Sequence, residues 1–460
     1  MKEKVLLLLY SVLLCNFKIL ITQIIGKFKM EKKHEEIAFY ETDVAKNLMG
    51  MFRGRAVGGI RSNFIVGHIY AGKSGLTQIS GNLAYLIKKE ERRALIITDV
   101  FTKKFAGKVM KSLDHIDMVS RVWSGVEAEV PLYTIDEGVK ICEEFKPKVL
   151  IAIGGGSVID AAKILLLKYE KPKANIYGII PFIPLGLRKK VNYLVAIPTT
   201  SGTGSEVTIY SIFTNVNRDP PKKIELSHPE LIPDYVILDT DFVKDMPPFL
   251  TMATGLDAFS HAIGSYISGW GGPLIDALNT SAIKEIIKYL PRAYKYGAKD
   301  LEAREHMQWA ALIAGMGFNN SKLGIDHSLG HSFGGVFNIH HGLSVGIFLP
   351  YTITFQAKVS DRWKDLCPIF NVESVGKNRN ILLGEFVQKV KNFILSIGGS
   401  IIIKDLKNPV ISEEKFKQKL EILTKYAESD GITLLSTRYI NKELFKKIFE
   451  YAWDGKDIDF

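Results

Sequence analysis

The residues best suited to chemistry lie in two clusters in the second half of the chain. Asp257 and His261 are four residues apart in TGLDAFSHAIG, so on a helix they share one face. The second cluster, DHSLGHSFGGVFNIHHG, repeats this spacing with His327 and His331 and ends in a pair of further histidines. Imidazoles with one carboxylate bind Zn²⁺ or Fe²⁺ better than Ca²⁺ or Mg²⁺, which prefer oxygen ligands. A single histidine of this kind is more often a satisfied core residue, but the constellation predicts one divalent metal ion.

A glycine turn earlier in the chain is a candidate nucleotide site. In KPKVLIAIGGGSVIDAAKILLL, the apolar run 149–153 precedes Gly154, Gly155, Gly156 and Ser157, and a helical pattern follows. A strand that leads through glycines into a helix presents backbone N–H groups and a positive dipole end to phosphate oxygens. The run lacks the last glycine of the dinucleotide fingerprint G-x-G-x-x-G. A plain tight turn is therefore an equal alternative for this segment alone.

A second loop of the same kind follows the next apolar run. In YLVAIPTTSGTGSEVT, the predicted strand 194–197 ends in hydroxyls and glycines that could hydrogen-bond a pyrophosphate or an amide. The candidate residues of this loop are Thr199, Thr200, Ser201, Thr203 and Ser205. A loop that is merely rich in turn residues is the alternative.

Together these motifs resemble those of the iron-containing (group III) alcohol dehydrogenases. GGGSVIDAAK, PTTSGTGSEVT, TGLDAFSHAI and DHSLGHSFGGVFNIHHG follow the family's order and spacing, and the resemblance extends from about Phe64 to the C-terminal YAWDGKDIDF. The resemblance implies four metal ligands: Asp257, His261, His327 and His341. It places His331 on the substrate side, where an imidazole suits the transfer of the alcohol proton towards solvent. It gives His340 no role.

The resemblance also implies a nicotinamide dinucleotide as cofactor. Asp99 ends the run RALIITD, where a carboxylate can bind the adenosine ribose and repel a 2′-phosphate. Family members that prefer NADP tend to have glycine at this position, so NAD is the expected cofactor and NADP the less favoured one. A helix N-cap is the alternative role for Asp99, and a solvated surface residue is the alternative for Lys223, which matches a cofactor-contacting lysine. The residues expected to bind the cofactor are Asp99, Gly154, Gly155, Gly156, Ser157, Asp160, Thr199, Thr200, Ser201, Thr203, Ser205 and Lys223.

The elements that must position these residues differ between the two halves of the chain. From residue 63 to 241, strand-like runs alternate with helical patterns, which predicts a parallel sheet with crossover helices. From 242 to 460, helical periodicity dominates. We therefore predict an α/β dinucleotide-binding domain followed by an all-helical metal-binding and catalytic domain, with the active site in the cleft between them. The stretch from Asp365 to Asn380 is predicted as a loop.

The composition is that of an ordinary globular enzyme. Its 47% apolar and 24% charged residues are near the average, and 460 residues suffice for more than one domain. The three cysteines, Cys15, Cys142 and Cys367, are too scattered for a disulfide framework or a thiolate metal site, which favours the cytoplasm. The net charge of +11 is spread over short lysine runs and does not indicate a nucleic-acid partner.

The first 29 residues form an apolar leader, VLLLLYSVLLCNFKILITQII with its flanks. It is similar to a signal-peptide core or a marginal membrane span, but no small-residue cleavage site is evident. Met30 begins a polar stretch typical of a cytosolic start. We expect residues 1–29 to lie outside the fold and residues 30–62 to form an N-terminal extension. A membrane anchor is the alternative.

These observations predict a metal-dependent alcohol dehydrogenase that moves hydride reversibly between a small alcohol and NAD. The ion, for which Fe²⁺ is favoured and Zn²⁺ is possible, would act as a Lewis acid on the substrate oxygen, and the cofactor would perform the hydride chemistry. A zinc glycerol-dehydrogenase-like enzyme or a dehydroquinate-synthase-like lyase on the same scaffold is the alternative. A membrane-tethered metal or nucleotide binder without catalysis is a remote one. A homodimer or larger homo-oligomer is expected.

Overall fold

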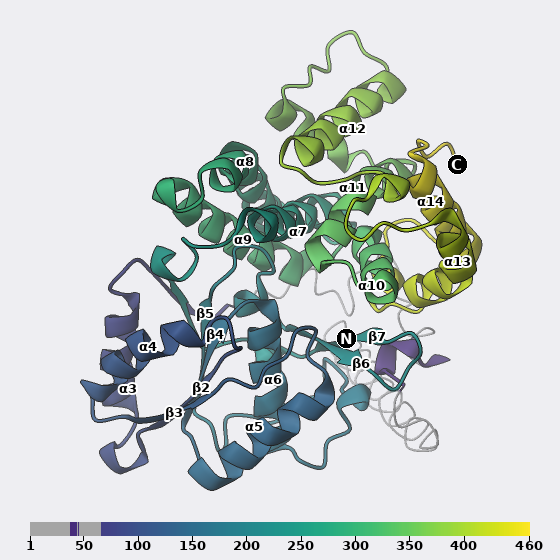
Figure 1. Ribbon diagram of the computed structural model, residues 1–460. Helices are drawn as coiled ribbons and strands as arrows, with labels where there is room; N and C mark the ends of the chain where they lie inside the picture. Colours follow the sequence, from purple (N-terminus) through teal and green to yellow (C-terminus); the bar gives the residue numbers. More distant parts are fainter. Residues whose placement is uncertain (1–36, 44, 46–65) are drawn as a thin grey trace, which may run out of the picture.

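The computed structural model describes residues 37–43, 45 and 66–460. An α/β region lies in the lower half of Figure 1 and a helical region in the upper half. This arrangement confirms the predicted fold class. The predicted leader, residues 1–29, lies outside the described residues, as does most of the predicted extension 30–62. In the part of the chain that is described, no helix combines the length and the apolar character needed to cross a bilayer.

The α/β region is built on a six-stranded sheet in which all paired neighbours are parallel. In their order across the sheet, the strands are β1 (His68–Ala71), β8 (Tyr235–Leu238), β5 (Tyr193–Pro198), β4 (Val149–Gly154), β2 (Arg93–Ile97) and β3 (Val119–Trp123). The apolar runs RALIITD, 149–153 and 194–197 coincide with β2, β4 and β5, and a fourth such run, YVIL, forms β8. Their residues are almost all buried, as expected for strands that are covered on both faces.

Helices cover both faces of this sheet. They are α3 (Gly75–Leu86), α4 (Ala106–Asp114), α5 (Leu132–Phe145) and α6 (Gly156–Glu170). Successive side chains of a strand point to opposite faces, and in β4 Ile151 packs into the core that contains α3 and α4, whereas Leu150 packs into the core that contains α5 and α6. In a sheet covered in this way, ligands bind at the carboxyl ends of the strands.

An antiparallel hairpin follows the hydroxyl-rich loop. It consists of β6 (Tyr210–Asn215) and β7 (Lys222–Ser227). Lys163 of α6 is buried beneath β6, and its ammonium donates to the backbone oxygens of Thr208 (3.0 Å) and Tyr210 (2.5 Å). These bonds fix the hairpin to the helix that starts at the glycine turn.

The described N-terminal piece packs against this hairpin. We call residues 38–42 the N-terminal strap; it contains the 3₁₀-helix η1 (Phe39–Glu41), purple in Figure 1. Glu41 accepts hydrogen bonds from Arg218 (3.0 Å) and from Lys222. The Lys222 ammonium, only 4% exposed, also donates to the Ser429 hydroxyl at 2.8 Å. The strap is therefore tied through one buried lysine to both the hairpin and the helical region.

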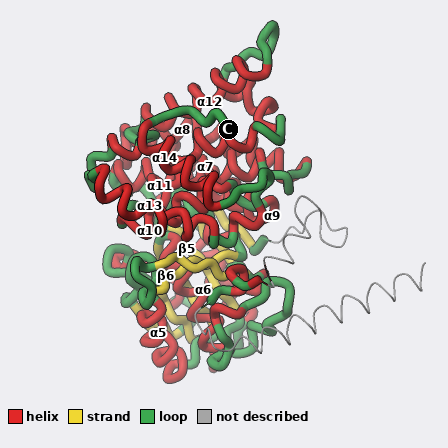
Figure 2. Tube along the Cα trace, turned by 90° about the vertical axis from the view of Figure 1, so that its right-hand side faces the viewer, coloured by secondary structure: helices red, strands yellow, loops and turns green. Residues whose placement is uncertain are grey.

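The helical region has a single extended core, and Figure 2 shows it as the red upper half of the molecule. Its α-helices are α7 (Pro248–Ile267), α8 (Pro273–Tyr296), α9 (Leu301–Ser321), α10 (Ile325–Phe337), α11 (His341–Ala357), α12 (Arg379–Ser396), α13 (Glu413–Glu428) and α14 (Lys442–Asp454). Helix α7 packs against α8, α9 and α11, and its residues 251–267 are all buried. A helix that is buried all round is a rigid central support.

The stretch from Asp365 to Asn380 is not the continuous loop that was predicted. The 3₁₀-helix η10 (Arg362–Phe370) extends into it, and α12 begins at Arg379. Trp363, Leu366 and Phe370 are buried along η10. Their spacing of three and four residues is helical, but the polar residues and the proline between them concealed it, so this prediction was wrong.

Candidate active site

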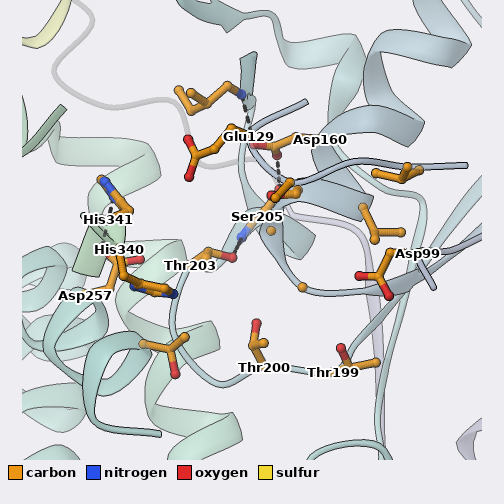
Figure 3. A pocket seen from close by; sticks show the side chains of 18 of the residues that line it. Asp99, Glu129, Asp160, Thr199, Thr200, Thr203, Ser205, Asp257, His340 and His341 are labelled. Carbon is orange, nitrogen blue, oxygen red and sulfur yellow. Dashed lines mark hydrogen bonds and ion pairs between the residues drawn. The ribbon is translucent and has the colours of Figure 1, made fainter. Parts of the chain in front are cut away.

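A cavity of about 1030 Å³ lies where the α/β region meets the helices. It is lined by the residues that directly follow the carboxyl ends of β4 and β5 and by residues of α7 and α10. Figure 3 shows Asp257 and His341 at one side of it and Asp99 at the other, with Thr200 and Thr203 between them. The two sets of residues predicted from the sequence thus face a common space.

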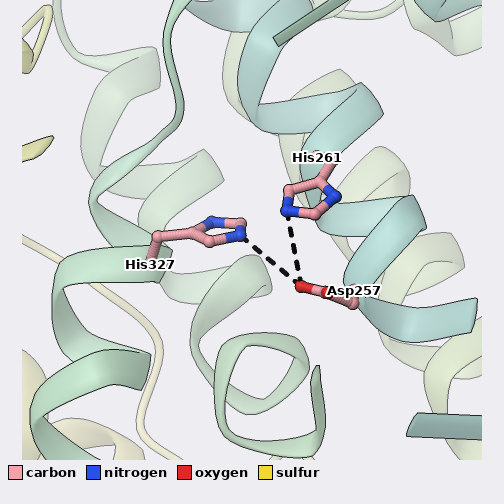
Figure 4. A group of neighbouring side chains, drawn as sticks. All are labelled: Asp257, His261 and His327. Atoms are coloured by element: carbon pink, nitrogen blue, oxygen red, sulfur yellow. Dashed lines mark ion pairs between the residues drawn. The ribbon is translucent and has the colours of Figure 1, made fainter. Parts of the chain in front are cut away.

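Two predicted metal ligands, His261 and His327, converge on one carboxylate oxygen of a third, Asp257 (Figure 4). Asp257 and His261 lie one turn apart on α7, and the His261 Nε2 is 3.5 Å from the Asp257 Oδ1. His327, on α10, directs its Nε2 to the same oxygen at 3.6 Å. The ligand atoms of these three residues lie within 4.8 Å of one another, and all three residues are buried.

The fourth predicted ligand, His341, reaches the same oxygen from the first residue of α11. Its Nε2 is 3.2 Å from the Asp257 Oδ1, but the residue lies outside the compact group of three and its side chain is 24% exposed. A Cβ on Gly342 would overlap the carbonyl oxygen of Ala253 in α7. Glycine at this position therefore lets the start of α11 approach α7 closely enough for His341 to reach the site.

The chemistry of this group fits a divalent metal ion. The Asp257 Oδ1 and the His327 Nε2 are buried and have no hydrogen-bond partner among the described residues. An unsatisfied buried carboxylate oxygen is costly, and an ion would satisfy it. Two ligands held at about 2.1 Å from a tetrahedral ion are about 3.4 Å apart. The three nitrogen-to-oxygen distances, 3.2, 3.5 and 3.6 Å, bracket that value.

The local electrostatics keep most of these groups in the deprotonated form that can bind a metal ion. Burial lowers the pKa of His261 to about 3 and that of His341 to about 4, so both imidazoles retain a free lone pair. Burial would raise the pKa of Asp257, but His261 and His341 hold it well below its ordinary value. Burial lowers the pKa of His327, but Asp326 and Asp257 outweigh it and raise that pKa to about 9. A bound ion would displace this proton.

Two aspartates orient the histidines of α10. The His327 Nδ1 is 2.8 Å from the Asp326 Oδ2, and the His331 Nδ1 is 2.9 Å from the Asp430 Oδ2. Each carboxylate accepts a hydrogen bond from the Nδ1–H group, which directs the opposite nitrogen of the ring to the cavity. His331 thus belongs to a different pair from His327, although the two lie one turn apart on α10. Neither aspartate was singled out from the sequence.

The two predicted phosphate loops lie against each other. A Cβ on Gly156 would lie 2.8 Å from the Thr203 side chain, and a Cβ on Gly155 would lie 3.2 Å from that of Thr200. The glycines therefore let the start of α6 contact the hydroxyl-rich loop. Gly155, Gly156, Ser157, Thr199, Thr200 and Thr203 line the cavity.

Gly154 and Ser201 are not among the residues that line the cavity. A Cβ on Gly154 would overlap the Val158 side chain, so this glycine allows the strand to pack against the first turn of α6. Ser201 is 5% exposed. Direct contact of these two with a cofactor stays a prediction without geometric support.

Asp160 and Ser205 line the cavity but use their polar atoms within the protein. The Ser205 hydroxyl donates to the Asp160 Oδ1 at 2.5 Å, and the backbone N–H of Ile212 donates to the Oδ2 at 2.9 Å. Lys163 donates to the Ser205 oxygen at 3.0 Å. This network links α6 to the hydroxyl-rich loop and to β6, so it fixes the positions of Asp160 and Ser205 in the cavity wall.

Asp99 and Lys223 lie in the cavity wall, each with a partner. The Asp99 Oδ1 accepts hydrogen bonds from the backbone N–H groups of Phe101 (2.9 Å) and Thr102 (2.7 Å) and so closes a turn. It is not the helix N-cap that was the alternative role, because Thr102 is the N-cap of the 3₁₀-helix that follows, η4 (Lys103–Phe105). The Lys223 ammonium lies 2.6 Å from the Glu129 carboxylate. These hydrogen bonds occupy only one oxygen of Asp99, so they do not exclude a contact with a ribose.

Family models match both regions of the chain. Residues 69–240 match the model of iron-containing alcohol dehydrogenase, and residues 251–453 match the C-terminal model of the Fe-containing alcohol dehydrogenase family. The chain belongs to the iron-containing alcohol dehydrogenases. The match confirms the predicted family, and with it a nicotinamide cofactor and a metal ion for this enzyme class. The lyase and the non-catalytic binder have no such support.

Named relatives of this alcohol dehydrogenase differ in cofactor and length. The chain is 35% identical over 400 residues to the NADPH-dependent butanol dehydrogenase of Clostridium saccharobutylicum, covering 85% of this chain and 98% of that one. It is 34% identical over 268 residues to the NAD-dependent methanol dehydrogenase of Bacillus methanolicus, covering 58% of this chain and 68% of that one. It is 30% identical to the bifunctional aldehyde-alcohol dehydrogenase of Escherichia coli (strain K12), covering 81% of this chain but only 44% of that longer protein.

A solved structure shows the same architecture. The iron-containing alcohol dehydrogenase from Thermococcus thioreducens superimposes with a TM-score of 0.73 at 28% identity, over 86% of this chain and the whole of that one.

Proposed function

We propose that this alcohol dehydrogenase oxidises a small alcohol with NAD as the preferred cofactor and reduces the matching aldehyde or ketone in reverse. The observation that carries the proposal is the convergence of Asp257, His261 and His327 at one side of the cavity whose other side is built from the glycine and hydroxyl loops. Asp257, His261, His327 and His341 would hold the ion. When bound, the metal supplies Lewis acidity to the substrate oxygen, and the nicotinamide carries the hydride.

His331 is the group proposed to move the proton. Asp430 accepts a hydrogen bond from the Nδ1–H group, so the Nε2 retains the lone pair that can take a proton from the substrate hydroxyl. His331 lines the cavity, and its ring stacks on that of His341 with centroids 5.1 Å apart. This stacking places His331 beside a proposed metal ligand, while His331 itself serves as a proton acceptor and not as a ligand.

The loops are proposed to hold the cofactor. Helix α6 begins at Gly156, so its N-terminal N–H groups face the cavity where a pyrophosphate can accept hydrogen bonds. Thr200 and Thr203 add hydroxyl groups next to this helix end. A homodimer, implied by the family resemblance, and a cytoplasmic location, favoured by the few scattered cysteines, stay predictions.

The proposed activity is tested with protein loaded with Fe²⁺ without oxygen, or with Zn²⁺. We expect NADH to form with short primary alcohols, and to stop forming after a chelator removes the metal. Absence of NADH and NADPH formation with every alcohol, together with no reaction of the matching aldehydes, would overturn the proposal.

Asp99 is the residue proposed to set the preference for NAD. This preference needs its own test, because the named relatives include both an NADPH-dependent and an NAD-dependent enzyme. We expect Asp99→Asn to lower the ratio of kcat/KM with NAD to kcat/KM with NADP by about tenfold or more, because a like-charge clash is worth roughly 1–3 kcal/mol. Asparagine can still accept the hydrogen bonds of the turn from Phe101 and Thr102, so a loss of the turn does not contribute. Asp99→Gly, which removes these hydrogen bonds and the charge together, is the matched comparison. An unchanged ratio in both variants would leave Asp99 only its role in the turn.

A further inference from the structure

Lys322 stands out among the residues that line the cavity. It follows α9 directly and lies between Phe318, whose ring contacts that of His261 at 4.2 Å between centroids, and α10, which carries His327. Its side chain faces the same cavity as the metal group. It therefore lies at the metal side of the cavity, away from Asp99.

The backbone of Lys322 is in a conformation that favours glycine. Its φ is +79° and its ψ is 163°, a region that residues with a Cβ rarely adopt because the side chain is strained there. A lysine at such a position is destabilising unless its side chain contributes something in return. The position itself would be unstrained with glycine.

The ammonium group of Lys322 is oriented but not neutralised. The Nζ donates to the Tyr210 hydroxyl at 3.0 Å, and the Tyr210 ring stacks near that of Phe318 with centroids 6.0 Å apart. In the described part of the chain, this nitrogen forms no ion pair within 4.0 Å; the Glu225 carboxyl group, which lines the same cavity, interacts with it electrostatically from farther away. An ammonium has three N–H donors, so two remain for a ligand.

The other lysines of the cavity wall differ from Lys322. Lys223 is paired with Glu129 at 2.6 Å. Lys104 lies beside Phe105, near Asp99. The apolar residues Phe318, Leu323, Ile432 and Leu435 line the same cavity, together with Tyr210 and Glu225, which both interact with Lys322. This combination suits a short hydrocarbon chain that ends in an anion.

We propose that the substrate is a short hydroxy acid whose hydroxyl end reacts at the Asp257–His261–His327 group and whose carboxylate is bound by Lys322. This inference rests on the proposed alcohol dehydrogenase activity and names the substrate class. The reaction is the same: the carbinol carbon gives a hydride to the nicotinamide and the hydroxyl gives a proton to His331, which leaves an oxo acid. The carboxylate is unchanged and serves only for recognition.

The test compares ω-hydroxy acids of different chain length, each with its own amide, which has the same shape without the charge. We expect the wild-type kcat/KM to be at least about tenfold higher for the best acid than for its amide, mainly through KM, because a charge-assisted hydrogen bond strengthens binding. Lys322→Met should lower this acid-to-amide ratio roughly 10- to 100-fold. Lys322→Arg should keep most of the preference. Because both substrates are measured with the same variant, any general loss of activity cancels in the ratio.

A second measurement tests the strained backbone independently of activity. Lys322→Gly should lose the preference for acids while raising the melting temperature of the enzyme, because the strain is removed. A lower melting temperature would show that the lysine is kept for packing and would overturn the inference. Equal kcat/KM for acids and amides in the wild type, unchanged in Lys322→Met, would overturn the substrate class and leave the dehydrogenase activity standing. No oxidation of any alcohol would overturn both.

Discussion

Replacement of His261 by alanine is expected to remove the metal ion and the activity together. The change takes away one of three buried ligand atoms that lie within 4.8 Å of one another, and it leaves Asp257 as a buried charge with fewer partners. Loss of Lewis-acid assistance is worth several kcal/mol, so kcat should fall by about 10³-fold or more. Elemental analysis of the purified variant measures the metal content directly, and a chelator titration followed by melting temperature measures it through stability.

His341 and His340 provide a graded comparison for this experiment. His341→Ala should weaken metal binding less than His261→Ala, because His341 lies outside the compact group. His340→Ala removes the neighbouring ring, which packs edge-on against Phe249 with centroids 5.8 Å apart, and should retain the metal. Full occupancy in His261→Ala would exclude His261 from the ligand set.

Replacement of His331 by alanine is expected to leave the metal in place and to lower kcat by roughly 10²–10⁴, the usual contribution of a general acid–base group. The reason is its separate pairing with Asp430, 2.9 Å from its Nδ1. His327→Ala, one turn earlier on α10, should lose metal and activity together. The measurements are kcat with a short alcohol, metal content, and recovery of kcat when imidazole is added to His331→Ala.

The contrast between these two histidines decides the role of His331. If both variants lose the metal equally, His331 is a ligand. If His331→Ala keeps full activity, the proton reaches solvent through water alone. Recovery by imidazole would distinguish a missing proton acceptor from a distorted site, because a small base can fill the space of the deleted ring.

The sequence predicted the parts of the site that depend on local periodicity. The i, i+4 spacing placed Asp257 with His261, and His327 with His331, on single helices, and α7 and α10 confirm both pairs. Long apolar runs likewise predicted β4 and β5, because these strands are buried on both faces. Local patterns of this kind are strong because the element itself sets the side-chain directions.

The parts that escaped prediction depend on contacts between distant residues. Asp430 meets His331 across 99 positions of sequence, and no local pattern joins them. The hairpin was not predicted because its buried face includes Ser211 and Lys222, which interrupt the apolar alternation of a strand. Their partners, the backbone oxygen of Asp160 and the carboxylate of Glu41, lie elsewhere in the chain. The strained backbone of Lys322 likewise could not be predicted from the amino-acid composition.

The N-terminal strap changes where the folding unit should be considered to begin. The predicted α/β domain starts at residue 63, yet Glu41 supplies the carboxylate for a Lys222 ammonium that is 4% exposed. Removal of one partner from a buried ion pair costs about 3–5 kcal/mol, a large part of the stability of a typical protein. A chain trimmed back to the first strand would keep every proposed metal ligand and both loops, but would leave this lysine unpaired beside Ser429, next to the aspartate that orients His331. A chain trimmed to Met30 retains the pair. The part of the chain that stabilises this enzyme therefore begins well before its first strand, at a strap that carries none of the family motifs.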